Sequence, residues 1–498
     1  MSSTRQTQTE PNRWAVLSLL SVAQLMVVLD ATIINIALPS AQRSLGFSTD
    51  SRQWVVTAYA LAFGSLLLLG GKLGDLFGRK WTFIAGLAGF SLASAIGGLA
   101  QSYAMLVAAR ALQGVFGALL APSALSLLTV TFANSPDRPK AFGIFGAIAG
   151  GGASLGLLLG GALTQALTWR WCLYVNLVIA IPTGLVALRL LVNHRAEDRP
   201  RIDVPGVLTG SIGLFALVYG FSNAETHSWT TPITIIALAA SVVLLVSFVL
   251  IEQRASHPLL PLYIVWDRAR GGAFASIVLA GAGIFAVFLF LTYFMQDNLK
   301  LSPLTTGVAF MPMTALIVIS STTSQTKLLP RTGAKPLIVS GMVLGLVSML
   351  LLTRLSPSSS YAGNLLPSLM ILGLGMGLIF APAFGTATLG VPGNEAGVAS
   401  AMVNTSQQVG GSVGTSLLST LFASSAAAFA RSHVGTPNLS AASMVHGYTT
   451  AFWWASGIFA IGLIVAVTVF PARIKLAPAA GDDTSPAEPA GDVSLATD

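Results

Sequence analysis

The sequence predicts an all-α membrane protein whose helices cross the bilayer many times. Hydrophobic residues make up 54% of its 498 residues, only 9% are charged, and the mean hydropathy is +0.76. Soluble domains carry about 25% charged residues, so this chain lacks the charge needed to cover a soluble surface of its size. In addition, apolar stretches of roughly 20 residues, the length that spans a bilayer as a helix, recur along the whole chain.

Fourteen such stretches are separated by short polar or charged segments. They lie at 14–38, 53–73, 81–100, 104–133, 141–166, 171–192, 204–223, 232–251, 272–296, 306–326, 336–353, 364–386, 397–425 and 448–470. The first is too long for the apolar core of a signal peptide, so we expect it to remain as a helix. The thirteenth is rich in Ser, Thr, Gly and Gln, and we expect it to face other helices rather than lipid.

The charged residues between the stretches predict how the chain is oriented. If the N-terminus is inside, nineteen of the 26 Lys and Arg residues fall on the cytoplasmic side and six on the outer side, with Arg110 inside a span. Positive charge accumulates on the cytoplasmic side of membrane proteins, so both termini are predicted to be cytoplasmic, in a multi-pass protein of the cell membrane. Because this bias explains the net charge of +8, we expect no nucleic-acid partner.

A charged loop, GKLGDLFGRK, interrupts the apolar pattern between the second and third stretches. It resembles the loop 2–3 signature of the major facilitator superfamily, in which the loop acts as a conformational latch. The resemblance implies that Asp75 engages the start of the thirteenth helix, near 394–397. The latch residues that it implies are Gly71, Asp75, Gly78, Arg79 and Lys80. The alternative is a topology anchor of three positive charges, which would need neither Asp75 nor the glycine spacing.

Further motifs resemble the fourteen-helix drug:proton antiporter branch of that superfamily. LDATIINIALP at 29–39 is similar to its first-helix signature, and RALQGVFGA at 110–118 is similar to its fourth-helix motif. The fifth helix carries the branch's glycine pattern, with Leu157 where a proline is expected. The matching glycines are Gly143, Gly152, Gly156, Gly160 and Gly161. Three of them lie four residues apart and form a bare stripe, which lets a neighbouring helix approach closely. The resemblance implies that this fifth helix packs against its counterpart in the other half.

Two ionisable residues, Asp30 and Arg110, lie well inside the predicted spans. A charge in hydrocarbon costs several kcal/mol, so such residues normally face the interior of the bundle and have a function. Drying a carboxylate favours its protonated form, whereas a nearby arginine favours the charged form. As the resemblance implies, we expect Asp30 to carry the coupling proton and Arg110 to tune it. The alternative is a buried pair that only pins the first and fourth helices together.

Polar and aromatic side chains within the spans are candidates for a substrate cavity. They are Gln24, Asn35, Tyr59, Phe63, Gln113, Tyr293, Asn404 and Gln407. Each of them is as well explained by contacts between helices. In the family that the chain resembles, several members that export dications hold a second carboxylate in the C-terminal half. The tenth stretch carries no acid between Gly307 and Gln325, so the resemblance implies a neutral, zwitterionic or weakly charged organic substrate rather than a dication.

The resemblance implies a major facilitator fold of two six-helix bundles with two inserted helices. We predict a cytoplasmic tail at 1–13, the first bundle at 14–193, the inserted helices at 204–251 and the second bundle at 270–471. The acidic segment at 476–498 is small and polar, and we predict that it is disordered. The substrate site is expected between the two bundles, at the middle of the membrane.

The predicted function is proton-driven efflux of hydrophobic drugs or antibiotics by alternating access, by a monomer in the lipid bilayer. A dedicated exporter of one endogenous metabolite and a membrane sensor that transports nothing are the alternatives. The sequence has no G-x-x-x-x-G-K-[ST] phosphate loop, and its five histidines lack metal-ligand spacing. Its single cysteine, Cys172, excludes a disulfide framework. We therefore expect no enzyme activity, metal or cofactor, and a proton gradient as the energy source.

Overall fold

The computed structural model describes residues 12–133, 135–193, 203–434 and 438–471. The predicted acidic tail lies outside these residues, as does the N-terminal tail up to residue 11. Within the described residues the secondary structure is helical and contains no strand. The predicted all-α class is therefore confirmed.

Each of the fourteen predicted stretches forms a helix long and apolar enough to cross a membrane. The long helices are α1 (Arg13–Leu45), α2 (Thr49–Phe77), α3 (Arg79–Gly98), α4 (Tyr103–Thr131), α5 (Arg138–Ala166), α6 (Trp171–Leu190), α7 (Val204–Thr226), α8 (Pro232–Glu252), α10 (Arg268–Tyr293), α12 (Met311–Thr323), α14 (Ala334–Leu352), α15 (Leu366–Ala387), α16 (Ala396–Ser432) and α17 (Leu439–Val469). The shorter elements are α9 (Tyr263–Trp266), α11 (Pro303–Ala309), α13 (Leu329–Thr332), a 3-10 turn (Gly393–Glu395) and π-helical turns at Phe294–Asn298, Ser324–Leu328 and Tyr361–Leu365.

Local side chains explain several helix ends. The Asn12 side chain accepts a hydrogen bond from the Trp14 amide at the start of α1, and Gly46 ends that helix with a left-handed φ of 69°. Ser102 caps α4 in the same way as Asn12 caps α1. Asp267 accepts from two amides in the first turn of α10. These caps satisfy backbone groups that a helix end would otherwise leave unpaired.

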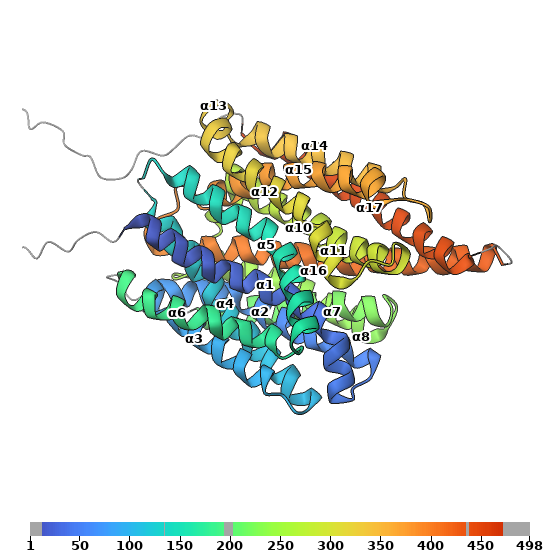
Figure 1. The fold of residues 1–498 in the computed structure, drawn as a ribbon. Helices are drawn as coiled ribbons and strands as arrows, with labels where there is room; N and C mark the ends of the chain where they lie inside the picture. The colour runs from blue at the N-terminus through green and yellow to red at the C-terminus, as the bar shows by residue number, and fades with distance from the viewer. Residues whose placement is uncertain (1–11, 134, 194–202, 435–437, 472–498) are drawn as a thin grey trace, which may run out of the picture.

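Several helices are longer than their apolar stretches predict, among them α16 and α17. α16 continues to Ser432 and α17 begins at Leu439, so their adjoining ends project past the other helices (Figure 1). The sequence prediction counted only residues apolar enough for hydrocarbon. A helix rich in Ala and Ser can continue beyond that limit because its backbone hydrogen bonds are made within the helix.

The helices form two bundles with a helix pair inserted between them in the chain. α1 to α6 pack against one another, and α10 to α17 form the second group (Figure 1). α7 and α8 pack on each other, and α7 also contacts α2 of the first bundle and α16 of the second. The Thr57 hydroxyl on α2 lies 3.1 Å from that of Ser222 on α7.

The starts of α1, α10 and α14 and the end of α17 lie at one end of the molecule. The Lys335 Nζ donates to the Phe470 carbonyl at 2.9 Å, and Arg268 donates to the Thr468 carbonyl at 2.9 Å. At the start of α5, the ammonium of Lys140 lies 4.5 Å from the centre of the Trp14 ring. We call this end the terminal face and the opposite end the far face.

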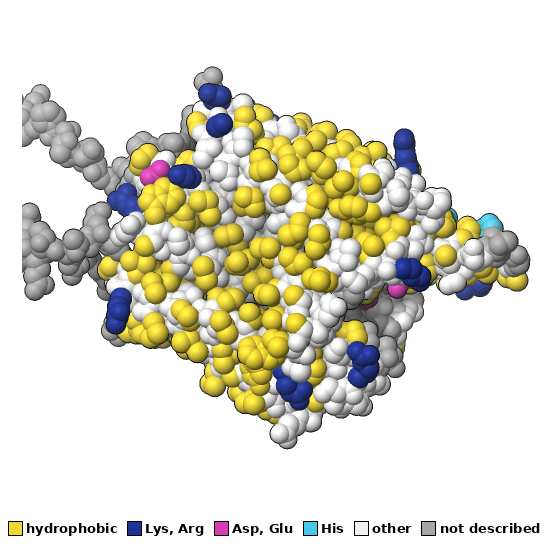
Figure 2. Space-filling view, viewed as in Figure 1, with side chains coloured by type: hydrophobic (Ala, Val, Ile, Leu, Met, Phe, Trp, Pro, Cys, Tyr) yellow, Lys and Arg dark blue, Asp and Glu magenta, His cyan; other side chains and the backbone are white. Residues whose placement is uncertain are grey.

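On the face shown in Figure 2, hydrophobic side chains cover the middle, whereas Lys and Arg lie toward the edges. α8 shows this most clearly, because Ile236, Val242 and Val243 are all more than 60% exposed. In a soluble protein such a surface would aggregate, but it is the surface that lipid tails require. The protein is therefore a multi-pass membrane protein.

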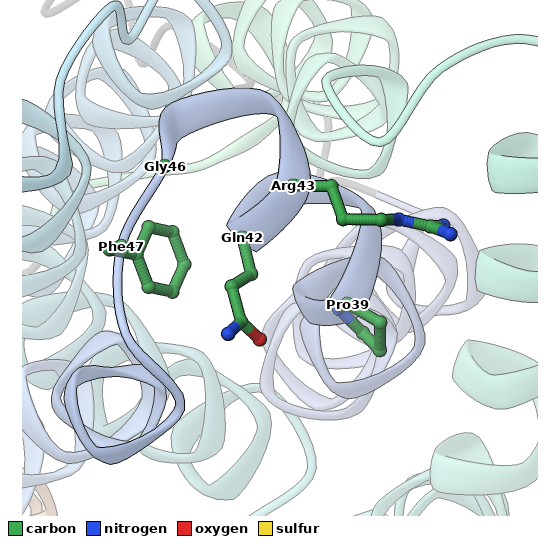
Figure 3. Close-up of a pocket in the computed structure, with 5 residues that line it drawn as sticks. All are labelled: Pro39, Gln42, Arg43, Gly46 and Phe47. Atoms are coloured by element: carbon green, nitrogen blue, oxygen red, sulfur yellow. The ribbon is translucent and has the colours of Figure 1, made fainter.

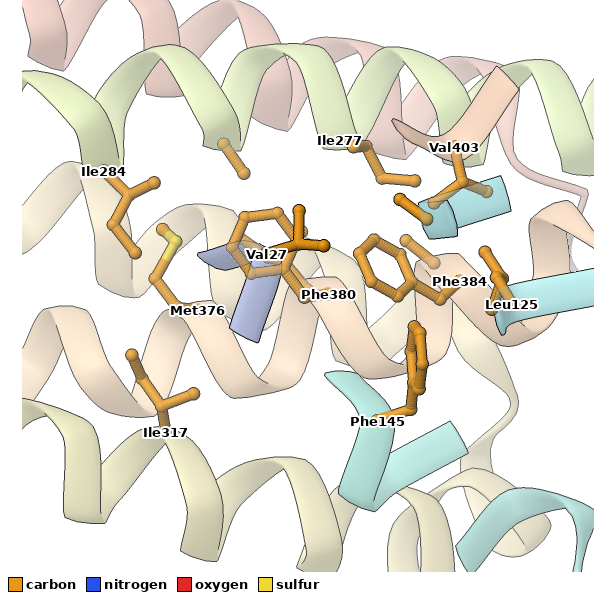
Figure 4. Close-up of a cluster of buried hydrophobic side chains, with 14 of the residues drawn as sticks. Val27, Leu125, Phe145, Ile277, Ile284, Ile317, Met376, Phe380, Phe384 and Val403 are labelled. Atoms are coloured by element: carbon orange, nitrogen blue, oxygen red, sulfur yellow. The ribbon is translucent and has the colours of Figure 1, made fainter. Parts of the chain in front are cut away.

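A set of apolar side chains joins the two bundles, and we call it the interbundle cluster (Figure 4). Val27, Leu125 and Phe145 come from the first bundle. Those from the second bundle are Ile277, Ile284, Ile317, Met376, Phe380, Phe384 and Val403. This packing holds the two bundles together in this conformation.

Candidate functional site

The carboxylate of Asp30 on α1 is bound by three side chains. Arg110 Nη1 on α4 forms an ion pair with its Oδ2 at 2.6 Å. Gln113 Nε2 on α4 and Asn176 Nδ2 on α6 donate to its Oδ1 at 2.9 Å and 2.7 Å. All four side chains are 0% exposed. A charge buried this completely is stable only because it is both paired and hydrogen-bonded.

A second layer of contacts orients the groups around Asp30. Arg110 Nε donates to the Val55 carbonyl on α2 at 3.2 Å, and its guanidinium carbon lies 4.4 Å from the centre of the Tyr59 ring. Ser94 on α3 accepts from Gln113 at 2.7 Å and from Asn176 at 3.2 Å. Five helices of the first bundle, α1 to α4 and α6, therefore meet at one carboxylate.

The structure brings Asp30 and Arg110 together, as the sequence suggested. Gln113, which we expected in the substrate cavity, belongs to the Asp30 site instead. Asn176 and Ser94 were missed. Asn176 does have a signal in the sequence, because it is the one amide side chain in the apolar helix at 171–190, and a lone buried amide in a membrane helix needs a polar partner.

The other predicted cavity residues differ in their burial and in their local contacts. Tyr59 and Phe63 are buried and stack with ring centres 5.5 Å apart. Asn404 donates to the Ser400 carbonyl of its own helix at 2.9 Å. Asn35 and Tyr293 are exposed, Gln407 is half-buried, and Gln24 is buried with no hydrogen-bond partner for its Oε1 among the described residues.

One open pocket of about 510 Å³ lies at the far-face end of α1 (Figure 3). It is lined by Pro39, Gln42, Arg43, Gly46 and Phe47. None of these side chains is acidic, and the pocket does not include any residue of the Asp30 site. We therefore do not regard it as the site of transport chemistry.

The loop between α2 and α3 joins the two bundles at the terminal face. Asp75 Oδ1 accepts from the Gly397 amide at 3.1 Å, and its Oδ2 accepts from the Val398 amide at 3.3 Å. Both amides belong to the first turn of α16, where the helix dipole favours a negative charge. The contact that the sequence suggested for Asp75 is thus present in the structure. Arg79 pairs with Asp75 at 2.6 Å and also donates to the Gly393 carbonyl.

Glycine allows the two backbones to approach closely beside this contact. A Cβ added to Gly71 would lie 2.5 Å from the Gly397 carbonyl oxygen and 2.7 Å from the Ala401 Cβ. Gly78 precedes α3 with a φ of +97°, a conformation that other residues rarely adopt. Lys80 donates to the Leu188 carbonyl at 2.8 Å and so anchors the loop on α6.

The bare stripe on α5 faces α1. A Cβ on Gly152 would lie 3.0 Å from the Val28 side chain, and one on Gly160 would lie 2.9 Å from the Ile33 side chain. Gly156, between them, lies against the backbone and side chains of α1 in the same way. The stripe itself therefore packs within the first bundle, since α1 belongs to that bundle.

α5 does contact the second bundle, but through another face. Cβ atoms on Gly143 and Gly151 would lie 3.2 Å from Gln325 and 3.0 Å from Thr314. One on Gly146 would lie 2.8 Å from the Cα of Ala381 on α15. Of the predicted glycines, only Gly143 is therefore seen at the interbundle contact. α5 itself is a continuous helix, in which Leu157 and Gly161 are buried.

Similar proteins agree with this architecture. A family model described as the Major Facilitator Superfamily matches residues 20–415. The puromycin resistance protein pur8 of Streptomyces alboniger is 46% identical over 484 residues, or 96% of each chain. The cephamycin export protein CmcT of Amycolatopsis lactamdurans is 36% identical over 480 residues, again 96% of each chain.

A solved structure shares the fold. The crystal structure of the human organic anion transporter MFSD10 (TETRAN) covers 92% of this chain and 100% of its own, with a TM-score of 0.62 and 16% sequence identity. The family match runs from within α1 to within α16 and includes the inserted pair. The chain belongs to the Major Facilitator Superfamily.

Proposed function

We propose that the protein exports hydrophobic drugs or antibiotics across the cell membrane in exchange for protons, by alternating access between its two bundles. The observation that carries the proposal is the fully buried Asp30 carboxylate, held by Arg110 and two amides inside the first bundle. Relatives matched over nearly their whole length are named for puromycin resistance and cephamycin export, which supports an antibiotic as cargo.

The Asp30 site has the chemistry that a coupling residue requires. While the site is dry, the Arg110 charge is paired with the carboxylate, and an unpaired charge there would be expensive. A proton arriving at Asp30 neutralises it and leaves the Arg110 charge without its partner. The balance of attraction among α1, α4 and α6 then changes, so protonation alters the packing of the bundle. No cofactor is needed for this step.

Helix packing connects Asp30 to the second bundle, so that a movement of α1 can reach that bundle. α1 carries Asp30 on one side and packs with Val28 and Ile33 against the glycine stripe of α5. The opposite face of α5 lies on α12 and α15 of the second bundle through Gly146 and Gly151. A shift of α1 is therefore passed to the interbundle contact through one rigid helix.

The terminal face is closed by contacts between the bundles, and we propose that it faces the cytoplasm. Asp75 binds the start of α16, and Arg138 on α5 donates to the Thr388 hydroxyl at 3.1 Å. We propose that these contacts break when the cavity opens to collect cargo from the cytoplasm or the inner leaflet. The protein would then work as a monomer, since both bundles that form the cavity belong to one chain.

The test is a proton-flux assay with the full chain in proteoliposomes that contain a pH-sensitive dye. Puromycin and a chemically varied panel of compounds are added as cargo. We expect cargo-dependent proton movement with the wild type and none with Asp30→Asn, although that variant is folded and inserted. Asp297→Asn is the control, because Asp297 is an exposed acid near the far face and its removal should leave coupling intact.

The outcomes separate the alternatives. Full proton coupling in Asp30→Asn would contradict the assignment of Asp30. A response to one compound alone would indicate a dedicated exporter. Absence of cargo-dependent flux for the whole panel would favour a sensor that transports nothing.

A further inference from the structure

Gln325 lies where three helices of the two bundles meet near the terminal face. It belongs to the π-helical turn Ser324–Leu328 that ends α12, and it is 1% exposed. A Cβ on Gly143 of α5 would lie 3.2 Å from the Gln325 Cβ, and one on Gly385 of α15 would lie 3.6 Å from its Nε2. The side chain is therefore enclosed between α5 of the first bundle and α12 and α15 of the second.

The amide of Gln325 is unsatisfied in this position. Its Nε2 has no hydrogen-bond partner among the described residues, and neither does the hydroxyl of Ser321, one turn earlier and 0% exposed. Buried donors are nearly always paired, because leaving one unpaired costs stability. An apolar side chain of the same volume would avoid this cost. The closed conformation therefore gives no reason for an amide at this position.

An open conformation would explain why position 325 carries an amide. Gln325 lies against α5 where the two bundles meet, so separation of the bundles at the terminal face would expose its Nε2 and the Ser321 hydroxyl to the widening space. A π-helical turn is a typical feature of functional segments, since it displaces side chains from regular helical positions. The donors would then find acceptors on whatever enters.

The neighbours of Gln325 indicate what kind of molecule that is. The Phe142 ring lies 4.0 Å from the position of a Cβ on Gly385, beside the Gln325 amide. Phe145, Phe380 and Phe384 of the interbundle cluster lie farther along the same contact (Figure 4). Arg138 is the nearby cation, and it stacks on Phe142 and is bound to Thr388.

We propose that Gln325, assisted by Ser321, determines cargo specificity by donating a hydrogen bond to a carbonyl-type acceptor on an uncharged aromatic molecule. This inference rests on the proposed function, because it assumes that the terminal face opens to admit cargo. The aromatic side chains would hold the rings of the cargo, and the two donors would distinguish molecules that carry an acceptor from those that lack one.

The test uses a matched pair of probes and the full chain in lipid nanodiscs. The first probe is prodan, an uncharged naphthyl ketone, and the second is its analogue with a methylene in place of the carbonyl. Binding of prodan is followed by energy transfer from the protein's tryptophans, with empty nanodiscs as the background, and the analogue is measured by competition. We expect the wild type to bind the ketone more tightly than the analogue.

Gln325→Met keeps the length and volume of the side chain but removes the donor. We expect it to weaken ketone binding by roughly three- to tenfold and to leave binding of the analogue unchanged. Ser321→Ala should also weaken binding of the ketone, but by less. This variant replaces Gln325→Met in the test if Gln325→Met fails to fold. Gln408→Met is the matched control, because Gln408 is another amide between the bundles, against Gly64 of α2.

The ratio of the two affinities separates recognition from structure. A change that is equal for both probes, or equal in Gln325→Met and Gln408→Met, would show a general packing effect and overturn the inference. So would absence of saturable prodan binding to a wild type that transports cargo in proteoliposomes, a result that leaves the proposed function standing. Failure of the wild type to move any cargo would instead refute the proposed function.

Discussion

Asp75 on α2 binds the backbone amide of Gly397 on α16, so a carboxylate of the first bundle caps a helix of the second. The two residues are separated by 322 positions, and both are buried. The contact satisfies a backbone donor at a helix start and places negative charge where the helix dipole favours it. It therefore stabilises one arrangement of the bundles relative to any arrangement in which they separate at the terminal face.

Removing the charge of Asp75 should open the terminal face. Asp75→Asn loses the ion pair with Arg79 and two charge-assisted hydrogen bonds, each contributing about 1.5–3 kcal/mol. We expect labelling of a cysteine placed at Val403, which is 1% exposed in the interbundle cluster, to become at least about tenfold faster. The measurement uses a maleimide and a Cys172→Ser background. Unchanged labelling would mean that Asp75 does not hold the bundles together.

Glycine at position 71 should be required for the same closure. Gly71→Ala places a Cβ 2.5 Å from a backbone oxygen of α16, so the two helices must move apart. We expect faster labelling at Val403, as in Asp75→Asn. Gly457→Ala is the control, because a Cβ there meets nothing within 4 Å, and we expect that variant to gain about 0.5–1 kcal/mol of stability. Equal labelling in the two variants would contradict the role of Gly71.

Arg110 should be essential to the stability of the first bundle. Arg110→Gln leaves the Asp30 carboxylate buried beside neutral side chains, and we expect a loss of about 3–5 kcal/mol in thermal or denaturant unfolding. Combining it with Asp30→Asn removes the unpaired charge and should restore most of that loss without restoring proton coupling. Additive destabilisation in the double variant would show that the two residues do not act as a pair.

The two faces of α5 should respond differently to an added methyl group. Gly156→Ala presses on α1 within the first bundle, so we expect a lower unfolding temperature and little change in labelling at Val403. Gly146→Ala presses on Ala381 of the second bundle, so we expect faster labelling with less effect on unfolding. Faster labelling in Gly156→Ala than in Gly146→Ala would instead show that the stripe at 152, 156 and 160 controls the contact between the bundles.

The sequence by itself determined the number and place of the membrane helices, because lipid requires each span to be apolar for about twenty residues. It also identified Asp30 and Arg110, since a charge in hydrocarbon needs a partner and the spans contain only these two well away from their ends. The loop motif indicated where Asp75 would bind.

Only the tertiary structure decided which faces meet. The glycine stripe on α5 is equally bare toward any neighbour, and its contact with α1 depends on how the two helices are rotated about their axes. For the same reason Asn176 joins Asp30, and the Nε2 of Gln325 lies between the bundles with no hydrogen-bond partner in the part of the chain that the structure describes. Periodicity shows which side chains share a helix face, but the partner of that face is set by packing among helices distant in the chain.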